Sequence, residues 1–196
     1  MNVLWDFDGT LFDTYPALVE GFISLSKRNL DRTEVLSWLK KDSKTAFKHY
    51  GISEDLRGEY QRLYNMHSVN SLPFDHIEEV LAAVAENVIV THRDKESTLM
   101  LLKKFDLLKY FQEVVSVEEQ GFTRKPHTAS YEYVLKTRHI DLVVGDRELD
   151  LIPARGLSIK TVAFQNPNIT ADFHINHYAD FIPKVLNQLD GSDFNI

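Results

Sequence analysis

The sequence predicts an α/β protein with a doubly wound parallel sheet and a small all-helical part. Over residues 75–196, short apolar runs typical of buried strands alternate with helical periodicity. Repeated βα units of this kind build parallel sheets with right-handed crossovers. One more apolar strand stands at residues 3–5, and the long segment after it shows helical periodicity only. We therefore expect a sheet-containing core, formed by residues 1–13 and 75–196, and a helical cap at residues 14–74.

The predicted elements follow in a regular order. The first strand, Val3 to Trp5, ends in an Asp-Gly turn, and Gly51 and Pro73 punctuate the cap segment. Within the cap, helical spacing of apolar residues recurs at 18–25, 35–39 and 56–64. The later elements are, in chain order, a helix at 77–84, a strand at 88–90, a helix at 97–104, a strand at 114–115, a helix at 130–137, a strand at 142–144, a short helix near 148–155, a strand at 159–162 and a helix at 181–189.

Composition limits the class of protein. With 196 residues, of which 43% are hydrophobic and 26% charged, the chain resembles a soluble globular protein with one good core. It has no cysteine, so a disulfide framework, a thiol nucleophile and a thiolate metal site are excluded. The first residues do not look like a signal peptide, and no apolar run approaches the ~20 residues that span a bilayer. We expect a cytoplasmic protein without a membrane partner.

The net charge of −7 argues against a nucleic-acid partner, because no strongly basic face is available. The charge is unevenly distributed, with a net +2 over residues 14–74 and −9 over the remainder. An acidic part that needs a metal, beside a mildly basic part, suits a small anionic substrate. Two ordinary solvated surfaces would give the same distribution.

The most informative motif is Asp6-Phe7-Asp8-Gly9-Thr10, directly after the first strand. Residues two apart on extended chain point the same way, so Asp6 and Asp8 are expected side by side. Parallel α/β sheets bind their ligands at the carboxyl ends of the strands. Two carboxylates this close repel each other unless a cation or a shared proton holds them. The motif therefore predicts a metal-dependent catalytic pair.

Polar residues also follow two later strands. Thr91, with His92 after it, ends the strand at 88–90, where a hydroxyl and free backbone N–H groups can hold a phosphate oxygen. Capping of the next helix is the simpler interpretation of Thr91. Lys125 precedes a proline between two strands, and its backbone direction is therefore restricted. A buried lysine here could neutralise carboxylates and bind phosphate, although a lone lysine is usually on the surface.

The strand at 142–144 runs into Gly145-Asp146, and Asp150 follows one helical turn later. Glycine allows the tight turn, and both carboxylates lie near the end of a strand. On its own this Gly-Asp-x-x-x-Asp pattern is weak evidence for a functional site. Combined with the opening motif it is strong evidence.

In this order and context, the motifs resemble those of the haloacid dehalogenase superfamily, and specifically its phosphatases with a helical cap after the first strand. The resemblance covers essentially the whole chain and implies a Rossmann-like core. It implies that Asp6 is the nucleophile that forms an aspartyl-phosphate and that Asp8 is the general acid and base. Thr91 and Lys125, with His92 beside them, would bind the phosphoryl group. The implied Mg²⁺ ligands are Asp6, Asp8 (through its backbone carbonyl), Asp146 and Asp150.

Three neighbours of these residues depart from the pattern of the superfamily. His92 stands where relatives often have Asn, Arg124 where Gly is frequent, and Thr128 where a second Pro is usual. None of them is a reacting group, so they bear on substrate identity more than on activity. Lys40, Lys44 and Lys48 recur at helical spacing and are interpreted as a solvated helix face. His174 and His177 fall in a tail expected to be irregular.

The sequence thus predicts a Mg²⁺-dependent phosphatase that acts on a small phosphorylated metabolite such as phosphoglycolate, a sugar phosphate or a nucleotide monophosphate. Asp8 favours phosphate-ester chemistry over dehalogenation. A sugar phosphomutase of the same superfamily would carry the same site residues. A catalytically silent binding protein on the same fold is the alternative outside enzymes, and six intact site residues argue against it. The substrate and the oligomeric state are not predicted.

Overall fold

The computed structural model describes residues 1–189 and 191, and these fall into two compact units. One comprises Met1–Phe12 and Pro73–Ile196, and the other comprises Asp13–Leu72. The predicted boundaries, after residues 13 and 74, differ from these by one and two residues. The first unit contains the sheet and is called the core here, and the second is the cap.

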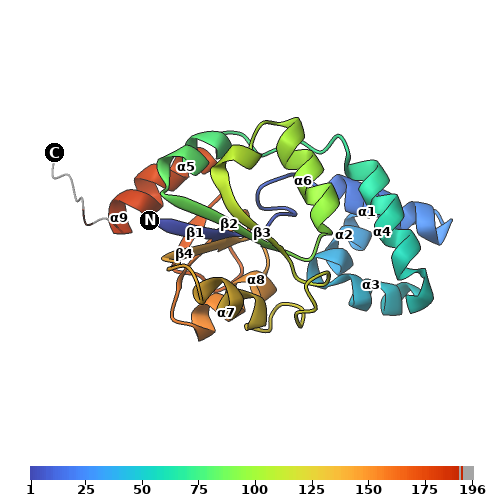
Figure 1. Cartoon of the computed structure of the whole chain (residues 1–196). Coiled ribbons are helices and arrows are strands. Elements are labelled where there is room, and N and C mark those ends of the chain that lie inside the picture. The colour runs from blue at the N-terminus through green and yellow to red at the C-terminus, as the bar shows by residue number, and fades with distance from the viewer. Residues whose placement is uncertain (190, 192–196) are drawn as a thin grey trace. The chain divides into compact units, whose positions relative to one another are not determined.

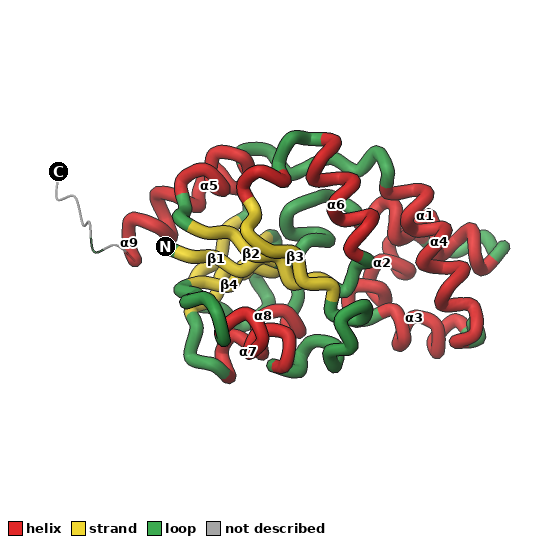
Figure 2. Tube along the Cα trace, viewed as in Figure 1, coloured by secondary structure: helices red, strands yellow, loops and turns green. Residues whose placement is uncertain are grey.

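The core is built on a six-stranded sheet with the strand order β3-β2-β1-β4-β5-β6, in which every pair of neighbours is parallel (Figure 1 and Figure 2). The first strand therefore lies in the middle, between β2 and β4. This is the doubly wound α/β fold that the sequence predicts. The strands are β1 (Asn2–Trp5), β2 (Glu86–Thr91), β3 (Phe111–Ser116), β4 (Leu142–Gly145), β5 (Lys160–Phe164) and β6 (Phe173–Ile175).

Helices cover both faces of the sheet because the strands are apolar on both sides. In β1, Val3 and Trp5 belong to one apolar cluster and Leu4 to another, as expected for side chains that alternate between faces. The first cluster includes side chains of α5 (Ile77–Ala83), α6 (Lys95–Lys104) and η4 (Ile182–Leu186). The second includes side chains of α7 (Ala129–Leu135) and α8 (Glu148–Gly156). Figure 1 shows α5 and α6 on one side of the sheet, and α7 and α8 on the other.

Two features of the core differ from the prediction. Residues 173–175, expected in an irregular tail, form the edge strand β6, with His174 exposed on it. The predicted last helix at 181–189 is helical but not a regular α-helix. Its chain passes from the short turn η3 (Tyr178–Asp180) through one stretch of π-helix, η4, into α9 (Asn187–Leu189). Pro183 stands in the first turn of η4, where a missing N–H costs no helical hydrogen bond.

A further one-turn helix, η2 (Leu108–Tyr110), leads into β3.

The cap contains only helices among its elements: α1 (Tyr15–Ser26), α2 (Arg32–Lys41), α3 (Ser43–Tyr50), η1 (Glu54–Leu56) and α4 (Arg57–Ser68). Its own apolar cluster is centred on Phe22, Phe47 and Tyr60, whose rings meet edge to face. The interpretation of Lys40, Lys44 and Lys48 as one helix face is wrong, because Lys40 lies in α2 and the other two lie in α3. Asp42 has an extended backbone and accepts a hydrogen bond from the N–H of Thr45, so it ends α2 and begins α3.

No helix among the described residues is long and apolar enough to span a membrane.

Candidate active site

The candidate active site is built at the carboxyl ends of β1, β4 and β2, the three central strands. Asp6 follows β1, Asp146 follows β4, and Thr91 is the last residue of β2. From β1 the chain adds β2 and β3 on one side and then β4, β5 and β6 on the other. Doubly wound sheets bind their ligands at the point where the strand order reverses in this way. Residues far apart in the sequence meet here because the carboxyl ends of parallel strands share one edge.

Three buried carboxylates come together at this edge. Asp6, Asp146 and Asp150 each offer an oxygen, and these oxygens lie within 4.8 Å of one another. Oδ2 of Asp6 is buried and accepts no hydrogen bond from the described residues. Carboxylate oxygens are the ligands that Mg²⁺ and Ca²⁺ prefer, and a buried oxygen with no hydrogen bond is costly unless a cation binds it. This donor set therefore fits a hard divalent cation.

Lys125 lies among these acids with its side chain fully buried. Its Nζ is 2.6 Å from Oδ1 of Asp6 and 2.6 Å from Oδ1 of Asp150, and it donates to the carbonyl oxygen of Val90 at 3.1 Å. Lys125 is thus not a surface lysine. The ammonium group partly offsets the negative charge of the cluster.

The protonation of Asp6 is shifted by this environment. Burial raises the pKa of its carboxyl group to about 7, and the negative charge of Asp150 adds to the increase, while Lys125 and Arg147 oppose it. Asp6 therefore stands near its midpoint of titration at neutral pH when no metal is bound. A carboxyl group poised in this range is typical of functional sites.

Asp150 shifts in the other direction. Burial alone would raise its pKa, but Arg147 and Lys125 together hold the pKa below its ordinary value. Arg147 Nε lies 3.3 Å from Oδ2 of Asp150. Burial likewise opposes the charge on Lys125, yet Asp150 and Asp6 raise the pKa of its ammonium group above the ordinary value. Lys125 and Asp150 are therefore a charged pair within the fold.

Asp8 does not bring its carboxylate to this cluster. The N–H of Asp6 still bonds to the carbonyl oxygen of Val144, and the chain turns after Phe7, where the N–H of Leu11 bonds to the carbonyl oxygen of Phe7 and Gly9 has a φ of 78°. The side chain of Asp8 is 16% exposed, and its Oδ1 lies 3.5 Å from Nη1 of Arg93. The prediction that Asp6 and Asp8 lie side by side stays a prediction, and of the two only Asp6 belongs to the acid cluster. Asp8 keeps some access to solvent.

Thr91 and Arg93 are held in one tight turn at the end of β2. Oγ1 of Thr91 accepts a hydrogen bond from the backbone N–H of Arg93 at 3.0 Å. Oγ of Ser116, at the end of β3, donates to the carbonyl oxygen of Arg93 at 3.0 Å. The cap of the following helix α6 is Asp94, which accepts from the N–H of Ser97. The interpretation of Thr91 as the helix cap is therefore wrong.

His92 uses its ring to support the neighbouring lysine. Its Nε2 lies 3.0 Å from the backbone nitrogen of Lys125, and its Nδ1 lies 3.0 Å from Nη2 of Arg124. Burial lowers the pKa of His92 far below its ordinary value, and the positive charges of Lys125, Arg124 and Arg147 lower it further. The ring is therefore neutral in the fold.

Sequence reasoning missed several residues of the site. Arg93 and Arg147 were not identified, because a single arginine in a loop is usually a solvated residue and no spacing distinguishes these two. Their side chains are 0% and 16% exposed, and they lie against Asp8 and Asp150. Asn166 also supports the site, because it donates to the carbonyl oxygen of Asp146 at 2.8 Å. Gly-Asp followed by Arg is the only local signal that could have indicated Arg147.

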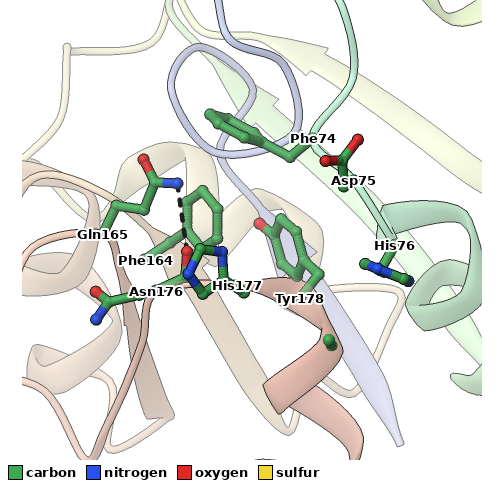
Figure 3. Close-up of a pocket in the computed structure, with 9 residues that line it drawn as sticks. Phe74, Asp75, His76, Phe164, Gln165, Asn176, His177 and Tyr178 are labelled. Carbon is green, nitrogen blue, oxygen red and sulfur yellow. Dashed lines mark hydrogen bonds between the residues drawn. The ribbon is translucent and has the colours of Figure 1, made fainter.

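The loop after β1 is backed by a small hollow of about 290 Å³ within the core (Figure 3). Tyr178, which lines the hollow, donates its hydroxyl to the carbonyl oxygen of Thr10 at 2.8 Å and stacks on Phe164. The backbone of Phe74, also in the lining, donates to the carbonyl oxygen of Leu11 at 3.1 Å. These contacts fix the loop that carries Asp6 and Asp8.

Gly145 is required by the close approach of Asp150. A Cβ atom at this position would lie 2.6 Å from Cβ of Asp150, so the side chain of Asp150 would have to move. We expect Gly145→Ala to weaken divalent-metal binding and to cost about 1–3 kcal/mol of stability, the usual range for overpacking. Metal titration and chemical unfolding measure the two effects. Gly58→Ala is the matched control, because no atom lies within 4 Å of a Cβ there. Equal behaviour of the two variants would contradict the requirement.

The fold and the site define a class of protein: an enzyme with a doubly wound parallel sheet whose first strand carries a buried aspartate, joined by acids and a lysine from later strand ends. Residues 3–164 match the family model described as haloacid dehalogenase-like hydrolase. The chain belongs to this family and is a hydrolase.

Individual relatives agree with this assignment. A protein of Caldanaerobacter subterraneus, provisionally named pyrophosphatase PpaX, is 26% identical over 175 residues, which cover 82% of this chain and 80% of the relative. The crystal structure of a hydrolase from Streptococcus pneumoniae is 25% identical, with a TM-score of 0.61, covering 85% of this chain and 93% of that one. The crystal structure of a predicted phosphoglycolate phosphatase from Haemophilus somnus is 20% identical and shares the fold, with a TM-score of 0.75 over 93% of this chain and 96% of that one.

Proposed function

We propose that the protein is a Mg²⁺-dependent phosphatase that hydrolyses a small phosphorylated metabolite through an aspartyl-phosphate intermediate on Asp6. The observation that carries the proposal is the buried cluster of Asp6, Asp146 and Asp150 with Lys125 in contact with two of its members. The relatives named as a pyrophosphatase and a phosphoglycolate phosphatase support chemistry at phosphorus. The cytoplasmic location expected from the sequence stays a prediction.

The proposed first step is attack of the Asp6 carboxylate on the phosphorus atom of the substrate. Asp6 is well placed for this role because the opening loop and Lys125 hold it in one orientation. A carboxylate nucleophile divides a very slow hydrolysis into two easier steps. Lys125 and the hydroxyl of Thr91 would bind the phosphoryl oxygens.

Asp8 would supply and remove the protons. It would donate a proton to the leaving oxygen and then take one from the water that attacks the aspartyl-phosphate. Its partial exposure allows this exchange, and Nη1 of Arg93 lies 3.5 Å from Oδ1 of its carboxylate. Because of this contact, Arg93 is proposed to act through Asp8.

Asp6, Asp146 and Asp150, with the backbone carbonyl of Asp8, would hold the Mg²⁺ ion. When bound, the ion would offset the negative charge of the phosphoryl group that meets the Asp6 carboxylate. The side chains of Lys125 and Arg147 would complete the charge balance, because both lie against the acid cluster. The cap is proposed to select among substrates.

The proposed function is tested by phosphate release from an aryl phosphate and from a panel of phosphorylated metabolites. We expect turnover to require Mg²⁺ and to stop in excess chelator, because the site must hold three acids and a dianionic group together. Asp146→Ala should also remove activity while the protein remains folded by circular dichroism. Undiminished turnover in excess chelator would refute the metal requirement.

Metal affinity should depend on pH. Because the pKa of Asp6 is raised to about 7, Mg²⁺ must displace a proton from it below this pH. We expect the affinity of the metal-free protein for Mg²⁺ to rise about tenfold per pH unit below pH 7 and to level off above it. Calorimetric titration between about pH 5.5 and about 8.5 measures the effect. An affinity that does not change across this range would contradict it.

A further inference from the structure

Two cations lie against the buried acid cluster, and they approach different oxygens of Asp6. Nζ of Lys125 lies 2.6 Å from Oδ1. The guanidinium group of Arg147 approaches Oδ2, with its Nη2 at 4.0 Å. Oδ2 is also the oxygen that accepts no hydrogen bond from the described residues, so it is the oxygen that remains for a metal ion. Arg147 therefore stands beside the oxygen of Asp6 that a divalent cation would take.

Arg147 also shares the second acid of the cluster with Lys125. Nε of Arg147 lies 3.3 Å from Oδ2 of Asp150, whereas Nζ of Lys125 lies 2.6 Å from Oδ1. The negative charges of Asp6 and Asp150 are thus each shared between a lysine and an arginine. Positive charges that are close together repel each other strongly in a buried site, where water screens them little. A divalent cation that binds these carboxylates therefore competes with the guanidinium group for their charge.

The fold encloses the two cations to different degrees. The side chain of Lys125 is 0% exposed, and its ammonium group also donates to the carbonyl oxygen of Val90. The side chain of Arg147 is 16% exposed. Its contacts with the two acids, at 3.3 and 4.0 Å, are longer than the about 2.7–2.9 Å of a strong charge-assisted hydrogen bond. Lys125 is therefore a fixed part of the cluster, and Arg147 is the cation that another cation can replace.

The position of Asp150 does not depend on the side chain of Arg147 alone. The backbone N–H of Arg147 donates to Oδ2 of Asp150 at 3.3 Å, and Lys125 contacts the other oxygen. A substitution at position 147 that keeps the backbone conformation keeps both contacts. Loss of the guanidinium group therefore removes a positive charge from the cluster without removing the contacts that orient its acids.

We propose that Arg147 is an internal counter-ion that competes with Mg²⁺ for Asp6 and Asp150 and thereby sets the affinity of the site for the metal. This rests on the proposed function, whose metal site it regulates. In the metal-free protein the guanidinium group stabilises two buried carboxylates. When the metal binds, the guanidinium group gives up its share of their charge. Metal binding is thus an exchange of cations, and it is weaker than binding to the same acids with Lys125 alone.

Arg147→Met tests the exchange, because it removes the charge and keeps much of the length of the side chain. We expect calorimetry to show Mg²⁺ binding to the variant about 10–100-fold more tightly than to the native protein, since a positive charge near the bound cation is gone. In chelator, the midpoint of urea unfolding should fall by about 0.5–1 M, because two buried carboxylates lose a partner. A merely structural residue would give the opposite sign for the metal, since a disturbed site binds Mg²⁺ less tightly.

Arg155→Met is the matched control. Arg155 lies in the last turn of α8 and pairs with Glu148, which is not a member of the acid cluster. Its substitution should leave the affinity for Mg²⁺ unchanged. Arg147→Lys keeps the positive charge, so its affinity should stay closer to the native value than that of Arg147→Met. If Arg147→Met does not fold in chelator, Arg147→Gln replaces it, because its amide can still donate to Asp150, and the same rise in affinity is expected.

The results distinguish failure of this inference from failure of the proposed phosphatase. An affinity for Mg²⁺ in Arg147→Met that is equal to or below the native value would overturn the counter-ion, as would an unchanged urea midpoint in chelator or an equal rise in affinity in Arg155→Met. Tighter binding in Arg147→Met, with no phosphate released from any substrate by the native protein, would refute the phosphatase and support the counter-ion. Phosphate release by the native protein with no gain in affinity in Arg147→Met would do the reverse.

Discussion

Asp6→Asn should form no phosphoenzyme, whereas Asp8→Asn should accumulate it. An amide is a poor nucleophile, so the Asp6 variant cannot begin the reaction. The Asp8 variant keeps the nucleophile and loses only the proton donor and acceptor. With an aryl phosphate, whose leaving group needs no proton, its first step should persist. Its second step should slow by about 10²–10⁴, the usual contribution of general acid–base catalysis.

Intact-mass spectrometry after a brief acid quench distinguishes the two variants. A phosphate adduct should be present in Asp8→Asn and absent in Asp6→Asn. Asp13→Asn is a control substitution of a neighbouring exposed aspartate outside the cluster, and it should behave like the native protein. A phosphate adduct on Asp6→Asn at any residue would show that Asp6 is not the nucleophile.

Lys125→Met should destabilise the metal-free fold strongly. The substitution leaves Asp6 and Asp150 buried without the ammonium group that lies 2.6 Å from each. Removing one partner of a buried ion pair typically costs about 3–5 kcal/mol. The loss of stability should be smaller at acidic pH, because the carboxyl groups of Asp6 and Asp150 can then take up protons and become neutral. Denaturant unfolding in chelator at two pH values measures both effects.

Two further variants test this explanation. Lys125→Met combined with Asp150→Asn should recover part of the lost stability, because it removes one of the two carboxylates that the lysine had neutralised. Lys184→Met is the matched control, since Lys184 is an exposed lysine that pairs with Asp180 at 3.1 Å, and such pairs contribute little. If the double variant is no more stable than Lys125→Met alone, the cost does not arise from unpaired carboxylates.

The sheet could be predicted from the sequence where strands are long and apolar on both faces. The runs at 3–5, 88–90 and 142–144 are of this kind, and all lie at the centre of the sheet. The edge strand β6 was missed because three residues, one of them the exposed His174, give no apolar run. In the cap, α3 was missed because the lysine spacing continues across the break at Asp42.

The site shows a similar division. Asp6, Asp146 and Asp150 stand next to apolar strands, and the parallel topology alone brings them to one edge. The positions of Arg93 and Arg147 depend on side-chain packing between segments that are distant in sequence, and no periodicity records such packing. The orientation of Asp8 could not be predicted for the same reason, because its partner Arg93 comes from another strand end.

The central position of β1 has a consequence for biosynthesis. This strand is made first, yet its neighbours are β2, which begins at Glu86, and β4, which begins at Leu142. Such pairings between distant segments are slow to form, and an apolar strand with open edges can pair wrongly while it waits. Asp6 therefore leaves the ribosome long before Asp146 and Asp150. A nascent chain that ends before them has one of the three clustered carboxylates, so the acid cluster can form only after residue 150 has been synthesised.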